Sequence, residues 1–225
     1  AAGLKLELID ARLSIYDPTD LKGFPVVKGT GKSQAMHFVP PAILPTKGKG
    51  ILFLDELPSA PPSVQAAAYQ LILDKRLGEY ELPPGWSIVA AGNHARNGGV
   101  HYSLPPALAN RFVHIEMECN ADDWDAWAIA HGISDITRAF IRFRPALIHD
   151  MEARKAGTAF PTPRSWAFAD DIVRLHLGAN EEFELLKGTV GEGAAIEYLA
   201  FAKTARDLPS ASEILISPDS APVPS

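Results

Sequence analysis

The chain has 225 residues, of which 47% are hydrophobic and 21% are charged, and its net charge is -6. A chain of this length can bury a sizeable core, which excludes a mini-protein that depends on disulfides. No apolar run approaches the roughly eighteen residues of a membrane span, and the acidic balance argues against a protein that coats nucleic acid, because phosphate binding needs a concentrated basic face.

The beginning of the chain and its cysteine content predict a cytoplasmic protein. The first residues include no basic region followed by an apolar stretch, and Cys119 is the single cysteine, so it cannot form an internal disulfide. Both observations favour a reducing compartment. Residues 1–3 read Ala-Ala-Gly, which is typical of the end of a helix, so the chain is expected to begin inside a fold.

The first predicted strand covers residues 4–9, where leucines alternate with polar residues. Residues 16–49 contain Asp17-Pro18 and a group of prolines near position 40. Because these residues favour turns, we expect a stretch rich in loops with one short hairpin.

Further strands and a helix are predicted in the first half of the chain. Residues 51–54 are wholly apolar, which is typical of a central strand in a parallel sheet. Residues 85–91 and 112–117 are two more apolar strands, and residues 63–74 carry apolar side chains at helical spacing. Strands that alternate with helices predict an α/β fold with a mainly parallel sheet.

From Asn120 onwards the pattern changes to helices. Asn120, Ser134 and Thr162 can each cap a helix, and Thr162 is followed by a proline at the first helical position. The final residues are rich in Ser, Pro and Ala, which favours disorder. We therefore expect three regions: an α/β domain over residues 1–119, a small α-helical domain over residues 120–206, and a disordered tail over residues 207–225.

Two adjacent carboxylates, Asp55 and Glu56, follow the apolar strand at its carboxyl end, where open α/β sheets place their ligands. One carboxylate can hold Mg²⁺ while the other polarises a water molecule for attack on a phosphoryl group. The alternative is that both are turn residues that end the strand.

Three further polar residues lie at the ends of predicted elements. Asn93 ends the next strand and can hydrogen-bond an attacking water, although Gly-Asn is also an ordinary turn pair. Arg111 precedes the strand at 112–117 and either offers a planar cation to phosphate or is a solvated surface residue. Arg164 lies in the first turn of a helix, where a positive charge opposes the macrodipole unless an anion is nearby.

In order and context these residues resemble the motifs of the AAA+ ATPases, and the chain is similar to the MoxR family of that superfamily over residues 4–205. The matching segments are 51–56 for Walker B, Asn93 for sensor 1, Asn110-Arg111-Phe112 for the arginine finger and Pro163-Arg164 for sensor 2.

The resemblance implies an AAA+ P-loop NTPase core followed by a helical lid, and an ATP hydrolase that uses ATP and Mg²⁺. Asp55 would coordinate Mg²⁺ and Glu56 would activate water. Asn93 would orient that water, and Arg164 would contact the nucleotide from the lid. Arg111 would act in trans, which implies a homo-oligomeric ring, usually a hexamer. MoxR-like proteins are thought to remodel partner proteins as chaperones, often partners with von Willebrand A domains.

The chain departs from the family at the phosphate-binding loop, which should read G-x-x-x-x-G-K-[ST] between a strand and a helix. Residues 29–33 read Gly-Thr-Gly-Lys-Ser, but the first glycine of the pattern falls on Val26, and Pro40-Pro41 comes before a helix can form. We interpret this segment as an exposed hairpin turn. The family pattern places the loop ahead of residue 4, so this segment is expected to be missing and ATP affinity to be poor.

Two alternatives to an active ATPase that remodels proteins are kept. One is an interaction module, or inactive fragment, that has the fold without nucleotide chemistry. The other is an AAA+ machine that acts on nucleic acid, such as a loader or helicase, which the acidic charge balance disfavours.

Overall fold

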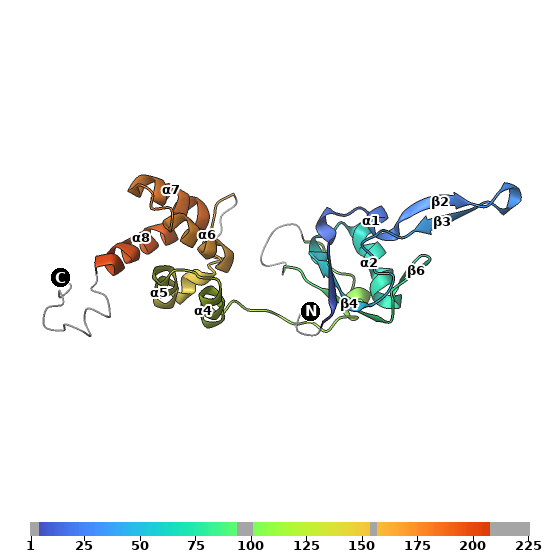
Figure 1. The fold of residues 1–225 in the computed structure, drawn as a ribbon, viewed down its shortest axis with the longest axis horizontal. Helices are drawn as coiled ribbons and strands as arrows, with labels where there is room; N and C mark the ends of the chain where they lie inside the picture. Colours follow the sequence, from blue (N-terminus) through green and yellow to red (C-terminus); the bar gives the residue numbers. More distant parts are fainter. Residues whose placement is uncertain (1–4, 94–100, 154–156, 208–225) are drawn as a thin grey trace. The chain divides into compact units, whose positions relative to one another are not determined.

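The computed structural model describes residues 5–93, 101–153 and 157–207, and the chain divides into two compact units, residues 1–115 and 116–225 (Figure 1). We call them the α/β unit and the helical unit. The division falls close to Asn120, where the sequence pattern changes to helices. The predicted tail lies outside the described residues, apart from residue 207.

The α/β unit is built on three parallel strands in the order β1-β4-β7. They are β1 (Glu7–Arg12), β4 (Lys49–Asp55) and β7 (Gly85–Ala90). The apolar run at residues 51–54 forms the middle of β4, and strands on both sides take up its backbone hydrogen bonds. The predicted α/β class, with its parallel sheet, is therefore confirmed.

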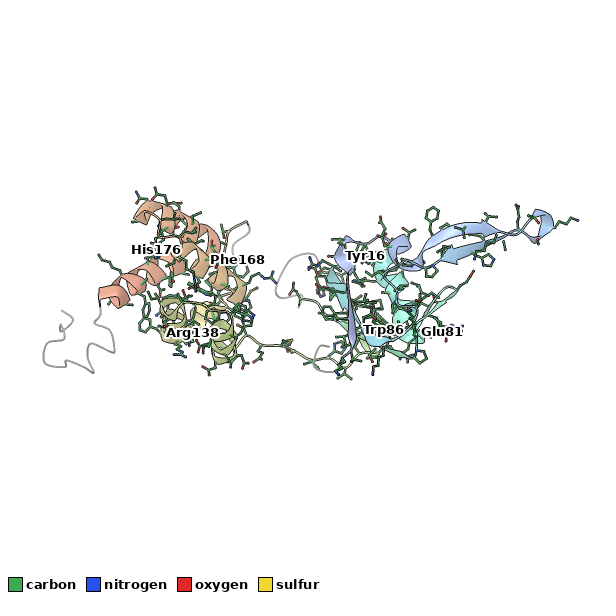
Figure 2. All side chains as sticks on the ribbon, in the orientation of Figure 1. Tyr16, Glu81, Trp86, Arg138, Phe168 and His176 are labelled. Atoms are coloured by element: carbon green, nitrogen blue, oxygen red, sulfur yellow. The ribbon has the colours of Figure 1, made fainter. Side chains whose placement is uncertain are left out.

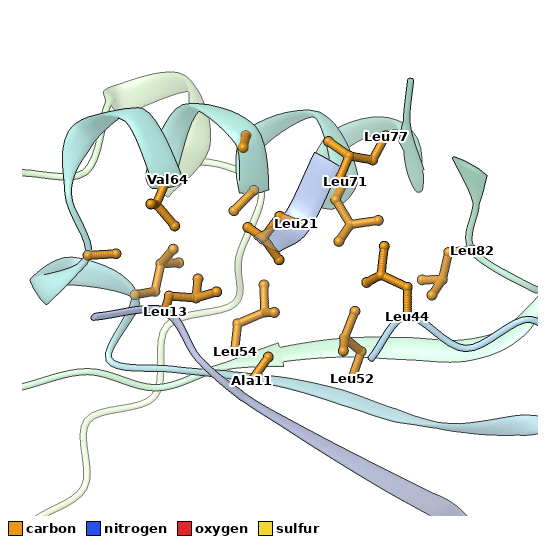
Figure 3. Close-up of a cluster of buried hydrophobic side chains, with 14 of the residues drawn as sticks. Ala11, Leu13, Leu21, Leu44, Leu52, Leu54, Val64, Leu71, Leu77 and Leu82 are labelled. Carbon is orange, nitrogen blue, oxygen red and sulfur yellow. The ribbon is translucent and has the colours of Figure 1, made fainter. Parts of the chain in front are cut away.

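The core of this unit lies between the sheet and helix α2 (Pro62–Asp74) (Figure 3). Leu52 and Leu54 of β4 point toward Val64 and Leu71 of α2, and all four side chains are fully buried. The buried positions of α2 recur at helical spacing, so one stripe of the helix faces the sheet. Helix α1 (Pro18–Lys22) adds a further buried leucine to this core.

The first strand lies three residues further along the chain than predicted, at residues 7–12 instead of 4–9. Ile9 and Ala11 face the core, whereas Leu8 is 56% exposed. Successive residues of a strand point to opposite faces, so the spacing of the leucines indicated the wrong face. The pairing of β1 with β4 decides which face is buried, and this pairing is not visible in β1 alone.

Residues 112–117 were predicted as a strand, and this prediction was wrong. They follow the short helix α3 (Pro106–Ala109) and form no strand. Phe112 packs against the core, but Val113, Ile115 and Met117 are 82–92% exposed. In the part of the chain that the structure describes, β7 pairs with β4 alone. Apolar alternation gives a strand only where a second strand accepts its hydrogen bonds.

The predicted hairpin in residues 16–49 is present. β2 (Phe24–Lys28) pairs antiparallel with β3 (Ala35–Val39), and the hairpin projects from the rest of the unit (Figure 1). The Gly-Thr-Gly-Lys-Ser segment forms its exposed tip, which contains the short 3-10 turn η3 (Gly31–Ser33). The interpretation of this segment as a hairpin turn is confirmed. A second, shorter hairpin follows α2 and consists of β5 (Arg76–Leu77) and β6 (Tyr80–Glu81).

The helical unit begins at the predicted caps. The Asn120 side chain accepts hydrogen bonds from two backbone amides in the first turn of its helix, and the Ser134 and Thr162 side chains each accept one at the starts of two further helices. The elements are α4 (Ala121–Ala130), α5 (Asp135–Phe143), η6 (Pro145–Ile148), α6 (Pro163–Val173), α7 (Ala179–Val190) and α8 (Glu192–Asp207). None of the described helices is long and apolar enough to cross a membrane.

Polar contacts join the helices of this unit. Arg138 of α5, labelled in Figure 2, forms an ion pair with Asp125 of α4 at 2.8 Å. Asp170 of α6 is 1% exposed and accepts hydrogen bonds from Thr137 Oγ1 at 2.7 Å and from Arg174 Nε at 2.7 Å, as well as from the Ser134 hydroxyl and backbone amide. Burial raises the pKa of Asp170, but these hydrogen bonds outweigh it and hold the pKa below its usual range.

Candidate functional site

Asp55 is the last residue of the central strand β4, so its side chain lies at the carboxyl edge of the parallel sheet. Arg12, the last residue of β1, is its register partner, and Arg12 Nε lies 3.6 Å from Asp55 Oδ2. The other carboxylate oxygen of Asp55 accepts a hydrogen bond from the Glu56 backbone amide at 3.0 Å. A hydrogen bond from a backbone amide and a partly exposed ion pair with a guanidinium therefore act on this carboxylate.

Glu56 adopts a left-handed backbone conformation, with φ of 56° and ψ of 32°. This region is unfavourable for residues other than glycine, and such residues gather at functional sites. The carbonyl of Glu56 accepts hydrogen bonds from the backbone amides of Ser59, in the short 3-10 turn η4 (Leu57–Ser59), and of Ala60. These bonds stabilise the sharp bend. Its carboxylate accepts a hydrogen bond from the Ser14 hydroxyl. The bend turns the chain immediately after Asp55 and directs two adjacent carboxylates to different partners.

Asn93 follows β7 and is exposed. Two backbone hydrogen bonds join the end of β7 to the chain around Asp55 and Glu56. The Ala91 amide donates to the Leu54 carbonyl at 3.0 Å, and the Leu57 amide donates to the Ala91 carbonyl at 3.1 Å. Gly92 lies so close to Pro58 that an added Cβ would be 2.1 Å from Pro58 Cδ. The structure therefore brings Asn93 to the same edge of the sheet as Asp55 and Glu56, as the sequence predicts for neighbouring parallel strands.

Arg111 is exposed in the turn after α3, where its amide donates to Leu108 at 3.0 Å. The following residue, Phe112, packs against the core and fixes this turn. In the described residues, the polar contacts of Asp55 and Glu56 come from Arg12, Ser14 and nearby backbone, and not from Arg111. The structure does not bring Arg111 into contact with the two acids within one chain.

Arg164 belongs to the helical unit and is exposed in the first turn of α6. Thr162 and Ser165 form a capping box at this turn, with hydrogen bonds of 3.0 and 2.8 Å. The Trp124 indole donates to the Pro163 carbonyl at 3.1 Å and ties the turn to α4. These contacts fix the position of the first turn of α6, from which the side chain of Arg164 extends.

Sequence reasoning missed Arg12 and Ser14, the two residues that hold the carboxylates. Both come from the end of β1 and the 3-10 turn η2 (Leu13–Ile15) that follows it. The signal for them is the strand register: once β1 lies beside β4, its last residue must face Asp55. That register depends on pairing between distant segments, so it could not be derived from the pattern of β1 itself.

The carboxylate oxygens at this edge are of the kind that bind a magnesium ion together with phosphate oxygens. Mg²⁺ is commonly held by one or two carboxylates, together with water and substrate phosphate oxygens. Asp55 supplies one partly exposed carboxylate at the correct end of the strand. Over the described residues, no group of three or more acidic, histidine or cysteine side chains could hold a metal ion. Asp55 would therefore hold Mg²⁺ as one carboxylate ligand, together with water and phosphate oxygens.

Comparison with known proteins gives no family for this chain, because no family model and no curated protein matches its sequence.

Proposed function

We propose that the chain is a MoxR-like AAA+ ATPase, with an AAA+ P-loop NTPase core and a helical lid, which uses ATP to remodel partner proteins. The observation that carries this proposal is the pair of carboxylates at the carboxyl edge of a parallel sheet. Asp55 is held by Arg12, and Glu56 is held by Ser14. Open α/β sheets bind their ligands at this edge, so two oriented carboxylates there favour chemistry on a bound ligand.

Each residue has a distinct role in this proposal. Asp55 would hold Mg²⁺, which when bound neutralises charge on the phosphate oxygens. Glu56 takes the proton of the attacking water, and Asn93 hydrogen-bonds that water from the neighbouring strand. Arg164 would bind phosphate of the nucleotide. Arg111 completes the site of the next subunit in a homo-oligomeric ring, an assembly in which it need not contact the acids of its own chain.

The proposed partners are proteins, and von Willebrand A domain proteins are the first class to test. A second candidate function is an interaction module without nucleotide chemistry. It is favoured by the position of Lys32, which lies at the tip of a projecting hairpin instead of the start of a helix. In that case Asp55 and Arg12 would serve only as an ion pair at the end of the sheet.

The test is Mg²⁺-dependent ATP hydrolysis, measured as phosphate release from the full chain. Glu56→Gln should lower the rate about 100-fold or more, because a positioned general base contributes at least that much. Glu184→Gln, a change at an exposed acid of α7, is the matched control and should leave the rate unchanged. Equal rates for the protein and Glu56→Gln would remove Glu56 from its role. No hydrolysis in any variant would favour the interaction module or inactive fragment, both of which lack nucleotide chemistry.

A further inference from the structure

The β2–β3 hairpin, residues 24–39, carries apolar side chains that the rest of its unit leaves uncovered. On one face of the ribbon, Val27, Met36 and Phe38 are 36–69% exposed. The hairpin projects away from the sheet (Figure 1). Single exposed apolar residues are ordinary, but here they are gathered on one short ribbon. Contiguous apolar surface of this kind marks an interaction site.

One face of the hairpin is wholly apolar. Residues directly opposite each other in an antiparallel pair share a face, and two such pairs form what we call the hairpin face: Pro25 with Phe38, and Val27 with Met36. The other face carries Phe24 and Val39, which are also exposed, and His37, whose Nδ1 lies 3.1 Å from the Glu79 carboxylate in the turn between β5 and β6. The His37 side therefore has one polar contact with the rest of the unit, and we take the wholly apolar hairpin face as the surface left for a partner.

The hairpin also offers unpaired backbone groups. Its sheet has two strands only, so in the described part of the chain each strand has one open edge. Pro25 removes a donor from β2, whereas β3 has no proline and keeps its full row of donors and acceptors. A two-stranded ribbon is marginal by itself, and a third strand adds both hydrogen bonds and cover for its apolar face. These features fit an extended peptide better than a folded surface.

The charge of the hairpin selects the partner. Residues 24–39 contain Lys28 and Lys32 and no acidic residue, although the whole chain carries a net charge of -6. Both lysines are exposed near the tip. An acidic segment is attracted to this tip, whereas the chain as a whole is acidic, so charge favours docking at the hairpin.

We propose that the β2–β3 hairpin binds an extended, acidic segment of a partner protein. The segment adds a third strand to the ribbon, packs its apolar side chains on the hairpin face and places carboxylates near Lys28 and Lys32. This assigns a client-binding surface to the remodelling activity and to that extent rests on the proposed function. Binding itself uses no nucleotide, so it can be measured separately from hydrolysis.

The probe is a fluorescent peptide about six residues long, the usual length of a strand, in which valine alternates with glutamate. Fluorescence anisotropy with the full chain, in the absence of nucleotide, measures its affinity. Val27→Ser and Met36→Ser should each weaken binding about tenfold, because each removes apolar contact from the hairpin face. Ile196→Ser, a change at a residue of α8 that is 53% exposed, is the matched control and should have no effect.

Two further arms test strand addition and charge. A peptide with N-methylated backbone amides cannot complete the ladder and should bind at least tenfold more weakly. Replacement of Lys28 and Lys32 by glutamate should transfer the preference to a peptide with lysine in place of glutamate. This charge exchange also shows that the variant retains a working hairpin, so a folding defect cannot imitate the result.

Three outcomes would overturn the proposal. Equal binding of the methylated peptide excludes strand addition, and unchanged affinity in Val27→Ser and Met36→Ser excludes the hairpin face. Tighter binding of single-stranded oligothymidine, lost on addition of salt, would assign the lysines to nucleic acid. Glu56→Gln separates this proposal from the proposed function, because it should abolish hydrolysis and leave peptide affinity unchanged.

Discussion

The Ser14 hydroxyl donates a hydrogen bond to the Glu56 carboxylate, two residues beyond the point where Arg12 pairs with Asp55. One short segment at the end of β1 therefore orients both carboxylates. Glu56 also has a left-handed backbone conformation, which sets the direction in which its side chain leaves the chain. The hydrogen bond from Ser14 then positions the carboxylate at the other end of that side chain. In the proposed function, this hydrogen bond would hold Glu56 in one position for its role as general base.

Ser14→Ala should lower the rate of ATP hydrolysis about tenfold, because the carboxylate of Glu56 loses the contact that orients it. Ser14→Thr keeps the hydroxyl and should retain most of the rate. The free energy of unfolding should change by about 1 kcal/mol or less, since a single hydrogen bond is lost at a partly buried site. Phosphate release and chemical denaturation measure the two quantities. Full activity of Ser14→Ala would show that Glu56 needs no support from Ser14.

Gly92→Ala should destabilise the α/β unit by about 1–3 kcal/mol, because the added Cβ would overlap the Pro58 ring and force the two segments apart. Asn93 would move with the displaced chain, so hydrolysis should fall as well. The control is Gly188→Ala in α7, where an added Cβ meets no neighbour within 4 Å. That change should stabilise the protein by about 0.5–1 kcal/mol, as expected in a helix interior. Thermal denaturation of both variants decides whether Gly92 is required by packing.

The elements with strong local patterns were predicted from the sequence. The four apolar residues 51–54 gave β4, and the helix caps Asn120, Ser134 and Thr162 gave the starts of three helices. In each case the determining interactions lie within a few residues of one another. A cap needs only its own first turn, and a central strand shows its burial in its composition.

The features that depend on distant segments were not predicted. The buried face of β1 is set by pairing with β4, and residues 112–117 form no strand because an apolar alternation cannot supply its own partner. The residues of the candidate site also fall into those visible in a local pattern and those that depend on distant segments. The end of β4 indicated Asp55 and Glu56 directly, whereas Arg12 and Ser14 became visible only with the strand register.

Acid should destabilise the helical unit through Asp170. Hydrogen bonds to the carboxylate overcome the effect of burial and hold its pKa below the usual value. A carboxylate with a lowered pKa in the folded state contributes stability above its unfolded pKa, near 4. This contribution is lost as the pH falls through the lower, folded value. The melting temperature, followed by circular dichroism, should therefore decrease below about pH 4.

Asp170→Asn tests this assignment. It should cost about 2–4 kcal/mol at neutral pH, because Arg174 and the Ser134 and Thr137 hydroxyls lose a charged acceptor. It should also make the acid dependence shallower. Asp171→Asn, at the exposed neighbouring position, should change stability by less than about 0.5 kcal/mol. An unchanged pH profile in Asp170→Asn would place the acid-sensitive group elsewhere.

Arg111→Ala tests the proposed ring, in which Arg111, exposed and away from the acids of its own chain, would contribute to the site of a neighbouring subunit. Alone, this variant should lose hydrolysis by about 1000-fold or more, the usual contribution of such an arginine. Glu56→Gln alone should also be inactive. Mixed together, the two should recover part of the activity, because a site with Glu56 from one subunit and Arg111 from the next is complete. Phosphate release from the mixture measures this directly. Inactive mixtures, with oligomers confirmed by light scattering, would show that Arg111 does not act across a subunit interface.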